Sequence, residues 1–274
     1  LLVHLLREAG VGSGDTVAVG ASGSFPGLLV ATLAAVEAME AFPVAILSLG
    51  ASSYGATRPE FHLLDLHVLL NREGIINNPP MAASLGGEGD VGEGFPQALR
   101  DSLAREVSSL GIPFLAEDSL PKNVARRMEI YCGSPEACPV TAFVNIGGAQ
   151  ANMGASPRIL QVPPGLSQDL TAKVDLPPPP RRGVLFEMAA REVPFIHLLH
   201  IRGLALKHGL PWDPLFPPKP NSTRLLRGTP SAGLPFWLLS AAYLLGLALI
   251  FISGLFPRHT VRRGPPSPSL QGKS

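Results

Sequence analysis

The sequence predicts an α/β fold in which a mostly parallel, doubly wound sheet carries Gly/Ser-rich loops after its strands. Short apolar segments rich in β-forming residues recur along residues 1–210, and amphipathic segments of helical period follow them. Small residues separate the two kinds of segment, and Gly and Pro number 29 each. Strands that alternate with helices form parallel sheets covered on both faces. We therefore expect one α/β domain over residues 1–210.

The first half of this domain is expected to contain three units of strand, loop and helix. The chain opens with apolar residues on one helical face, and we expect further sequence to precede Leu1. Ser24 is expected to cap the first long helix, and Pro26 to lie in its first turn. The expected strands cover residues 16–20, 43–49 and 82–85, and the expected helices cover residues 27–40, 59–73 and 96–110.

The second half continues this alternation around one irregular segment. Residues 155–182 lack periodicity and are expected to form a loop or cover segment. Strands are expected at residues 112–115, 140–146 and 193–199, and helices at residues 121–130, 183–191 and 201–208. The whole pattern predicts a parallel-rich sheet of at least five strands.

Small residues and hydroxyls follow four of the expected strands, in the segments SGS, SLGASS, SLGGEG and NIGG. In doubly wound sheets, ligands bind beyond the carboxyl ends of the strands. We expect these loops to share one edge of the sheet and to bind a ligand there. The candidate binding residues are Ser22, Gly23, Ser24, Ser52, Ser53, Gly86, Gly87, Gly147 and Gly148.

The first of these loops leaves three interpretations open. Small residues let backbone amides approach an anion at a helix N-terminus, where the helix dipole favours negative charge. Alternatively, Ser22 or Ser24 is a nucleophile held on a sharp turn, although the Gly-x-Ser-x-Gly pattern needs Gly where Ser24 stands. A tight turn that needs Gly for steric reasons alone explains the loop about as well. We favour anion binding.

Histidines and carboxylates offer further candidates. His197 and His200 could supply a base to a serine nucleophile, but they lie in or beside an apolar strand, where a core position is commoner. Several loop and helix carboxylates could ligate a hard cation or act in acid–base catalysis, although solvated carboxylates are commoner. These carboxylates are Glu60, Asp65, Glu88, Asp90 and Glu93.

No nucleotide-binding or metal-binding pattern is present. The first strand is not followed by Gly-x-Gly-x-x-Gly, and Gly-Lys-Ser/Thr does not occur. Cys132 and Cys138 are the only cysteines, too few for a four-cysteine zinc site. They form a disulfide in an oxidising compartment or stay as two thiols, and both alternatives remain open. We expect no metal and no cofactor.

The C-terminal region predicts a membrane anchor. Residues 236–256 are apolar and uncharged, and a helix of that length spans about 30 Å, the thickness of a bilayer core. A Pro-rich linker over residues 211–235 precedes this helix, and a basic, disordered tail over residues 257–274 follows it. The nearest basic cluster lies in the tail, so we expect a cytoplasmic tail, an extracytoplasmic α/β domain and the lipid bilayer as a partner.

The charge balance argues against a nucleic-acid partner. The formal net charge is +1, from 22 Lys and Arg against 21 Asp and Glu, and the two signs are mixed along the chain. A nucleic-acid surface would need a basic patch or stripe, and the sequence has none. We expect no nucleic acid among the partners.

Five motifs together resemble a known bacterial family. They are VAVGASGSFPGL, VAILSLGASSYGAT, AASLGG, FVNIGGAQANMG and VPFIHLLHIRGLALKHGLPWDP. In this order they resemble the poly-gamma-glutamate system protein family, over about residues 1–214 and the C-terminal hydrophobic segment. The resemblance implies an accessory protein of bacterial poly-γ-glutamate synthesis or export, with subunits of the synthetase complex as partners. It supplies no catalytic residues.

Two functional hypotheses therefore compete. The first is a membrane-anchored accessory component whose loops bind the anionic polymer or a partner subunit. The second is a serine-dependent hydrolase or transferase that acts on γ-linked polyglutamate through Ser22 or Ser24. Beside these two, a third and weaker hypothesis is a plain scaffold whose α/β domain only holds other membrane subunits together. A histidine or carboxylate within hydrogen-bond reach of either serine would favour the enzyme.

Overall fold

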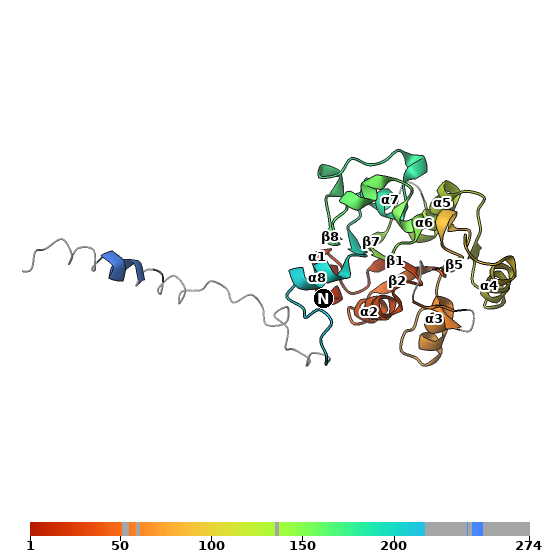
Figure 1. Ribbon diagram of the computed structural model, residues 1–274, viewed down its shortest axis with the longest axis horizontal. Helices are drawn as coiled ribbons and strands as arrows, with labels where there is room; N and C mark the ends of the chain where they lie inside the picture. The colour runs from red at the N-terminus through yellow and green to blue at the C-terminus, as the bar shows by residue number, and fades with distance from the viewer. Residues whose placement is uncertain (51–54, 59–60, 135–136, 217–239, 241–242, 249–274) are drawn as a thin grey trace, which may run out of the picture. The chain divides into compact units, whose positions relative to one another are not determined.

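The computed structural model describes residues 1–50, 55–58, 61–134, 137–216, 240 and 243–248. Contacts divide the chain into two units, Leu1–Leu225 and Leu226–Ser274. The first unit holds an α/β domain (Figure 1). In the second unit, the described residues 243–248 are helical.

A seven-stranded sheet forms the centre of the domain, in the order β6-β5-β2-β1-β7-β9-β8. Neighbouring strands are parallel except at one edge, where β8 pairs antiparallel with β9. The strands are β1 (Thr16–Ser22), β2 (Phe42–Ser48), β5 (Ala82–Ser84), β6 (Phe114–Leu115), β7 (Val140–Ile146), β8 (Gly165–Ser167) and β9 (Phe195–Leu198). This mostly parallel sheet with flanking helices confirms the predicted α/β class.

Helices cover both faces of the sheet (Figure 1). One face packs against α1 (Leu2–Glu8), α2 (Pro26–Glu37), α3 (Leu63–Arg72), α4 (Gln97–Ser109) and α8 (Ile201–Lys207). The other face packs against α5 (Leu120–Cys132) and α7 (Val184–Ala190). Shorter elements are the hairpin of β3 (Thr57–Arg58) and β4 (Phe61–His62), the helix α6 (Gln150–Met153), and the 3-10 turns η1 (Glu88–Asp90), η2 (Pro157–Gln161), η3 (Leu170–Ala172) and η4 (Pro179–Arg181).

The central strands are buried on both faces because successive side chains point to opposite sides of a strand. In β1, Val17 and Val19 pack in the core on the α2 side, and Ala18 packs in the core on the α5 side. In β7, Val144 and Phe143 divide between the same two cores. Two separate hydrophobic cores therefore hold the sheet in place.

The strand order creates a switch point between β1 and β7. From β1 the chain moves outward through β2, β5 and β6, and then returns through α5 to place β7 on the other side of β1. The connections after β1 and β7 thus leave in opposite directions along the sheet. A crevice opens beyond the carboxyl ends of strands at such a point.

Two helix boundaries differ from the sequence prediction. Ser24 does not cap α2, because Phe25 occupies the N-cap position and makes no side-chain hydrogen bond to the helix. Pro26 lies at the start of α2, as predicted. α3 begins at Leu63, later than predicted, because β4 extends through His62.

The predicted cover segment at residues 155–182 contains a strand that the sequence analysis missed. β8 pairs antiparallel with β9, with Gly165 opposite His197, so the sheet is mixed at this edge. Its three residues are too few to show the alternation that marks a strand.

Most of the predicted membrane helix, 236–256, lies outside the described residues, which include only Ser240 and 243–248 of it. Within the described ranges, no helix combines the length and the apolar character needed to cross a bilayer. The predicted tail at residues 257–274 and the linker residues 217–235 lie outside the described residues as well.

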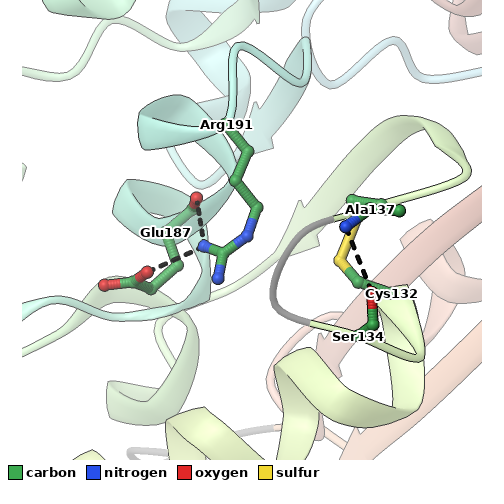
Figure 2. Close-up of a disulfide and its surroundings, with 6 residues drawn as sticks. Cys132, Ser134, Ala137, Glu187 and Arg191 are labelled. Carbon is green, nitrogen blue, oxygen red and sulfur yellow. Dashed lines mark hydrogen bonds and ion pairs between the residues drawn. A yellow bond between two sulfur atoms is a disulfide. The ribbon is translucent and has the colours of Figure 1, made fainter.

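A disulfide joins Cys132, the last residue of α5, to Cys138 (Figure 2). In the loop between them, the backbone N–H of Ala137 donates to Ser134 Oγ at 3.1 Å. This pairing is one of the two alternatives that the sequence left open. Arg191, the C-cap residue of α7 and also drawn in Figure 2, donates to Glu187 Oε2 at 2.8 Å and so links the end of that helix to its preceding turn.

A buried ion pair lies at the carboxyl ends of β2 and β5. Arg127 of α5 and Asp90 of η1 have fully buried side chains, and Arg127 Nη2 donates to Asp90 Oδ2 at 2.7 Å. The same nitrogen donates to Ser84 Oγ at 2.6 Å and Ser48 Oγ at 3.2 Å, and Ser84 Oγ donates to Asp90 Oδ1 at 2.8 Å. This network ties two strands, one helix and the loop after β5 together.

Breaking this pair is expected to destabilise the domain strongly. Arg127→Met leaves the Asp90 carboxylate buried without its cation, which should lower the free energy of unfolding by about 3–5 kcal/mol. The neighbouring exposed Arg126, which pairs with Glu129, is the matched control, and Arg126→Met should cost about 1 kcal/mol or less. Urea unfolding at neutral pH measures both variants. Equal losses for the two would contradict the assigned role of the buried pair.

Candidate ligand-binding crevice

A crevice of about 890 Å³ opens beyond the carboxyl ends of the strands, at the switch point between β1 and β7. Loops after five parallel strands (β1, β2, β5, β7 and β9) and the starts of α2 and α6 contribute to its walls. The lining residues are Ser22, Ser24, Phe25, Gly50, Gly87, Glu88, Glu93, Gly148, Ala149, Gln150, Met153, Gly154 and Leu199. The predicted loops therefore do converge on one edge of the sheet.

Ser22 supplies a buried hydroxyl to this crevice. It ends β1 and is 2% exposed, and its Oγ has no hydrogen-bond partner within the described part of the chain. Gly147, whose φ is +79°, lies so close to Ser22 that a Cβ on residue 147 would collide with Ser22 Oγ. A buried hydroxyl without a partner costs about 1–3 kcal/mol. A ligand atom that bonded to Ser22 would recover part of that cost.

The N-terminus of α2 forms the next part of the wall. The side chain of the N-cap residue Phe25 makes no hydrogen bond to this 12-residue helix, and Pro26 has no N–H. The amides of Leu28 and Leu29 turn back to the carbonyl of Phe25, at 3.0 and 3.3 Å. Among the described hydrogen bonds, the amide of Gly27 has no acceptor. Because the N-cap residue Phe25 lines the crevice, the positive end of the helix dipole lies beside it.

The loops after β2 and β5 form a second wall that carries negative charge. Gly50 donates its N–H to Leu85 O at 2.8 Å, and a Cβ on Gly86, whose φ is +74°, would lie only 3.0 Å from Gly50 N. The two loops thus pack backbone against backbone. Beyond this contact, the exposed carboxylates of Glu88 and Glu93 line the crevice.

Gln150, at the start of α6, connects the walls. Its Oε1 accepts a hydrogen bond from the backbone N–H of Gly89 at 2.5 Å, which ties η1 to the segment after β7. Asp90, beside Gly89, turns inward to the buried ion pair. The loop that presents Glu88 and Glu93 is therefore anchored on both sides.

His197 is a buried residue of β9 and is not placed as a base. It is 4% exposed, and its Nδ1 lies 2.8 Å from Asn145 Nδ2, which also donates to Gly147 O at 3.0 Å. Burial lowers the pKa of His197 to about 4, so the ring is neutral at neutral pH and accepts from Asn145. His200 is exposed at the start of α8 and does not line the crevice.

The other predicted site residues have different roles or lie outside the described residues. Gly23 donates its N–H to Ser48 O at 3.1 Å, and its carbonyl accepts from Ala56 at 2.8 Å, so it serves the loop backbone. Ser52 and Ser53 lie outside the described residues. No described histidine or carboxylate forms a hydrogen bond with the side chain of Ser22 or Ser24, the two proposed nucleophiles.

Four crevice residues with large side chains were not predicted from the sequence, nor were Ala149 and Gly154. Gln150 and Met153 belong to the segment GGAQANMG, which follows β7 and was used only for its glycines. Phe25 and Leu199 carry no signal that separates a crevice residue from an ordinary apolar one. Loop position after a parallel strand was the only signal that could have found all four.

Fold and crevice together define a doubly wound α/β protein with a crevice at its switch point. No family model, curated protein or solved structure matches the chain.

The burial of His197 predicts a loss of stability in mild acid. Its pKa of about 4 in the folded state lies below the usual 6.5, so protons bind the unfolded chain more tightly and stability falls as pH drops below about 6.5. This residue alone should cost about 2 kcal/mol between pH 7 and pH 5. Burial also lowers the pKa of His67, which adds a loss of the same sign.

Urea unfolding of the wild type and of His197→Gln at both pH values isolates the contribution of His197. The variant should lose less stability on acidification than the wild type. The same pH dependence in both proteins would show that His197 does not carry it.

Proposed function

We propose that this chain is a membrane-anchored accessory component of a bacterial poly-γ-glutamate synthesis or export system, and that its crevice binds the amino-terminal residue of a γ-linked glutamate chain. The observation that carries the proposal is the pairing, in one crevice, of the unpartnered Ser22 hydroxyl with the carboxylates of Glu88 and Glu93. The motifs that resemble the poly-gamma-glutamate system family include several residues that line this crevice.

Charge selects the end of the polymer. Every γ-linked residue carries a free α-carboxylate, but only the first residue also carries a free α-ammonium group on the same carbon. The α2 N-terminus and Ser22 favour a carboxylate, whereas Glu88 and Glu93 repel one and attract an ammonium. A purely anionic segment from the middle of the chain satisfies only the first wall. The amino-terminal residue satisfies both.

Binding is favoured over catalysis because the serines lack an activating group. A serine nucleophile needs a base within about 3 Å, itself held by a third group. Among the described residues, the buried His197 was a candidate base, but its Nδ1 is hydrogen-bonded to Asn145. We therefore assign Ser22 to ligand recognition.

The anchor of the proposed protein is the apolar segment at residues 236–256. Two features of the sequence support this anchor. The segment is uncharged over a length that spans about 30 Å as a helix, and basic residues follow it. With the tail in the cytoplasm, the α/β domain faces the exported polymer, and an oxidising compartment suits the Cys132–Cys138 disulfide.

Calorimetric titration of the full chain with γ-glutamyl-glutamate tests the site. The dipeptide should bind saturably. Its N-acetyl form, which lacks the ammonium group, should bind at least tenfold more weakly, which corresponds to a loss of about 1.4 kcal/mol or more in binding free energy. The double variant Glu88→Gln, Glu93→Gln should lose a similar factor for the dipeptide and little for its N-acetyl form. Ser22→Ala should weaken both ligands several-fold.

Glu73→Gln is the control for these variants, because Glu73 lies exposed at the far end of α3, away from the carboxyl edge. It should leave both affinities unchanged. Equal affinity for the free and acetylated dipeptides would refute the ammonium contact. Cleavage of the dipeptide that disappears in Ser22→Ala would instead support the serine hydrolase.

Protease protection tests the proposed topology. Protease added to spheroplasts should digest the α/β domain and leave a C-terminal tag intact, because the tag lies in the cytoplasm. Lysed spheroplasts serve as the control in which both parts are digested. A cleaved tag with a surviving domain would reverse the topology and separate the domain from the exported polymer.

A further inference from the structure

A second cluster of side chains lies outside the crevice, where α3 meets α4. His62 ends β4, Asp65 lies in the first turn of α3, and Glu106 projects from α4. One ligand atom from each of the three lies within 4.8 Å of the other two. The cluster joins segments that are more than 40 residues apart in the sequence.

The imidazole of this cluster is buried between two carboxylates. The His62 side chain is 3% exposed, and its Nε2 lies 3.1 Å from Glu106 Oε2, while its Nδ1 lies 3.3 Å from Asp65 Oδ2. The His62 side chain faces the backbone N–H of Asp65 in the capping box of α3, and within the described part of the chain its Nδ1 makes no well-formed hydrogen bond. Asp65 Oδ2 instead accepts from the His62 backbone N–H at 2.8 Å.

The two carboxylates have no other cation close to them. Among the described ion pairs, Asp65 and Glu106 each contact only His62. One imidazole offsets at most one of the two negative charges. A buried nitrogen without a hydrogen bond and an excess of negative charge both favour a bound cation.

We propose that His62, Asp65 and Glu106 bind one divalent transition-metal ion of the zinc class. Ligands at 2.0–2.2 Å from such an ion lie about 3.3 Å apart at the tetrahedral angle and about 4.2 Å apart on opposite sides. One ligand atom of each residue lies within 4.8 Å of the other two, so side-chain rotations of the two carboxylates bring both to the same imidazole nitrogen at this spacing. Asp65 and Glu106 are about one-third exposed, at 33% and 35%, so their carboxylates are free to rotate onto the ion.

Ligand chemistry selects the metal. Imidazole suits zinc, cobalt, nickel and iron, whereas magnesium and calcium sites use oxygen ligands. Three protein ligands leave at least one position for water, as in zinc sites that are not purely structural. The ion holds the β3–β4 hairpin and the start of α3 against α4. This site goes beyond the proposed function and depends on none of its steps, and it departs from the sequence-based expectation of no metal.

Titration of the untagged full chain with Zn²⁺ and Co²⁺ tests the site. One equivalent of Zn²⁺ should bind, and Co²⁺ should give visible d–d absorption bands that Zn²⁺ abolishes. At a free Zn²⁺ concentration 100 times Kd, Tm should rise by roughly 5–10 °C. Glu106→Gln should weaken Zn²⁺ at least tenfold and lose the cobalt bands.

Matched variants keep the test decisive. Asp101→Asn alters an exposed carboxylate on the same helix, and His4→Gln alters a surface histidine that faces His208; both should bind Zn²⁺ like the wild type. His62→Gln should abolish binding, and Glu106, which is one-third exposed, gives the deciding variant if the buried His62 variant fails to fold. Zn²⁺ binding that Glu106→Gln leaves unchanged, or no saturable binding by the wild type, would overturn the proposal.

Discussion

The buried ion pair between Arg127 and Asp90 is the constraint on which the crevice depends. Two opposite charges withdrawn from water are tolerated only with short contacts and further hydrogen bonds, and Ser48 and Ser84 supply these at the ends of β2 and β5. Asp90 adopts a left-handed conformation with φ +67°, which is rare for a residue with a side chain. The ion pair holds it there, and with it the loop that presents Glu88 to the crevice.

The crevice follows from this arrangement and from the strand order. β1 and β7 place Ser22 and Gly147 side by side at the switch point, and their packing leaves the Ser22 hydroxyl without a partner. Gln150 then links the segment after β7 to the anchored loop after β5 through Gly89. The ligand that we propose carries opposite charges on one carbon, and the two walls differ in the same way, with the start of α2 on one side and Glu88 and Glu93 on the other. The buried ion pair and the sheet hold these exposed loops in a defined geometry.

The sequence predicted the fold well because its signals are local. β7 was predicted with its observed bounds, and each long helix was recognised from its apolar period. β8 and the start of α3 were missed, since short elements are set by tertiary pairing. Among the candidate residues that loop position predicted, the ones that line the crevice are Ser22, Ser24, Gly87 and Gly148. Loop position does not predict that Gly23 forms backbone hydrogen bonds with neighbouring loops, or that Arg127 pairs with Asp90. These contacts join segments that are distant in the sequence.

The most direct test of the central claim is a map of backbone amide shifts by NMR as γ-glutamyl-glutamate is added to the protein. The account predicts shifts concentrated at the end of β1 and the start of α2, in the loop around Glu88, and at Gly148 to Gln150. Small changes at Asp90 should accompany them, because the ion pair anchors that loop. Shifts confined to other surfaces, such as the groove between α5 and α7, would contradict a ligand site at the switch point.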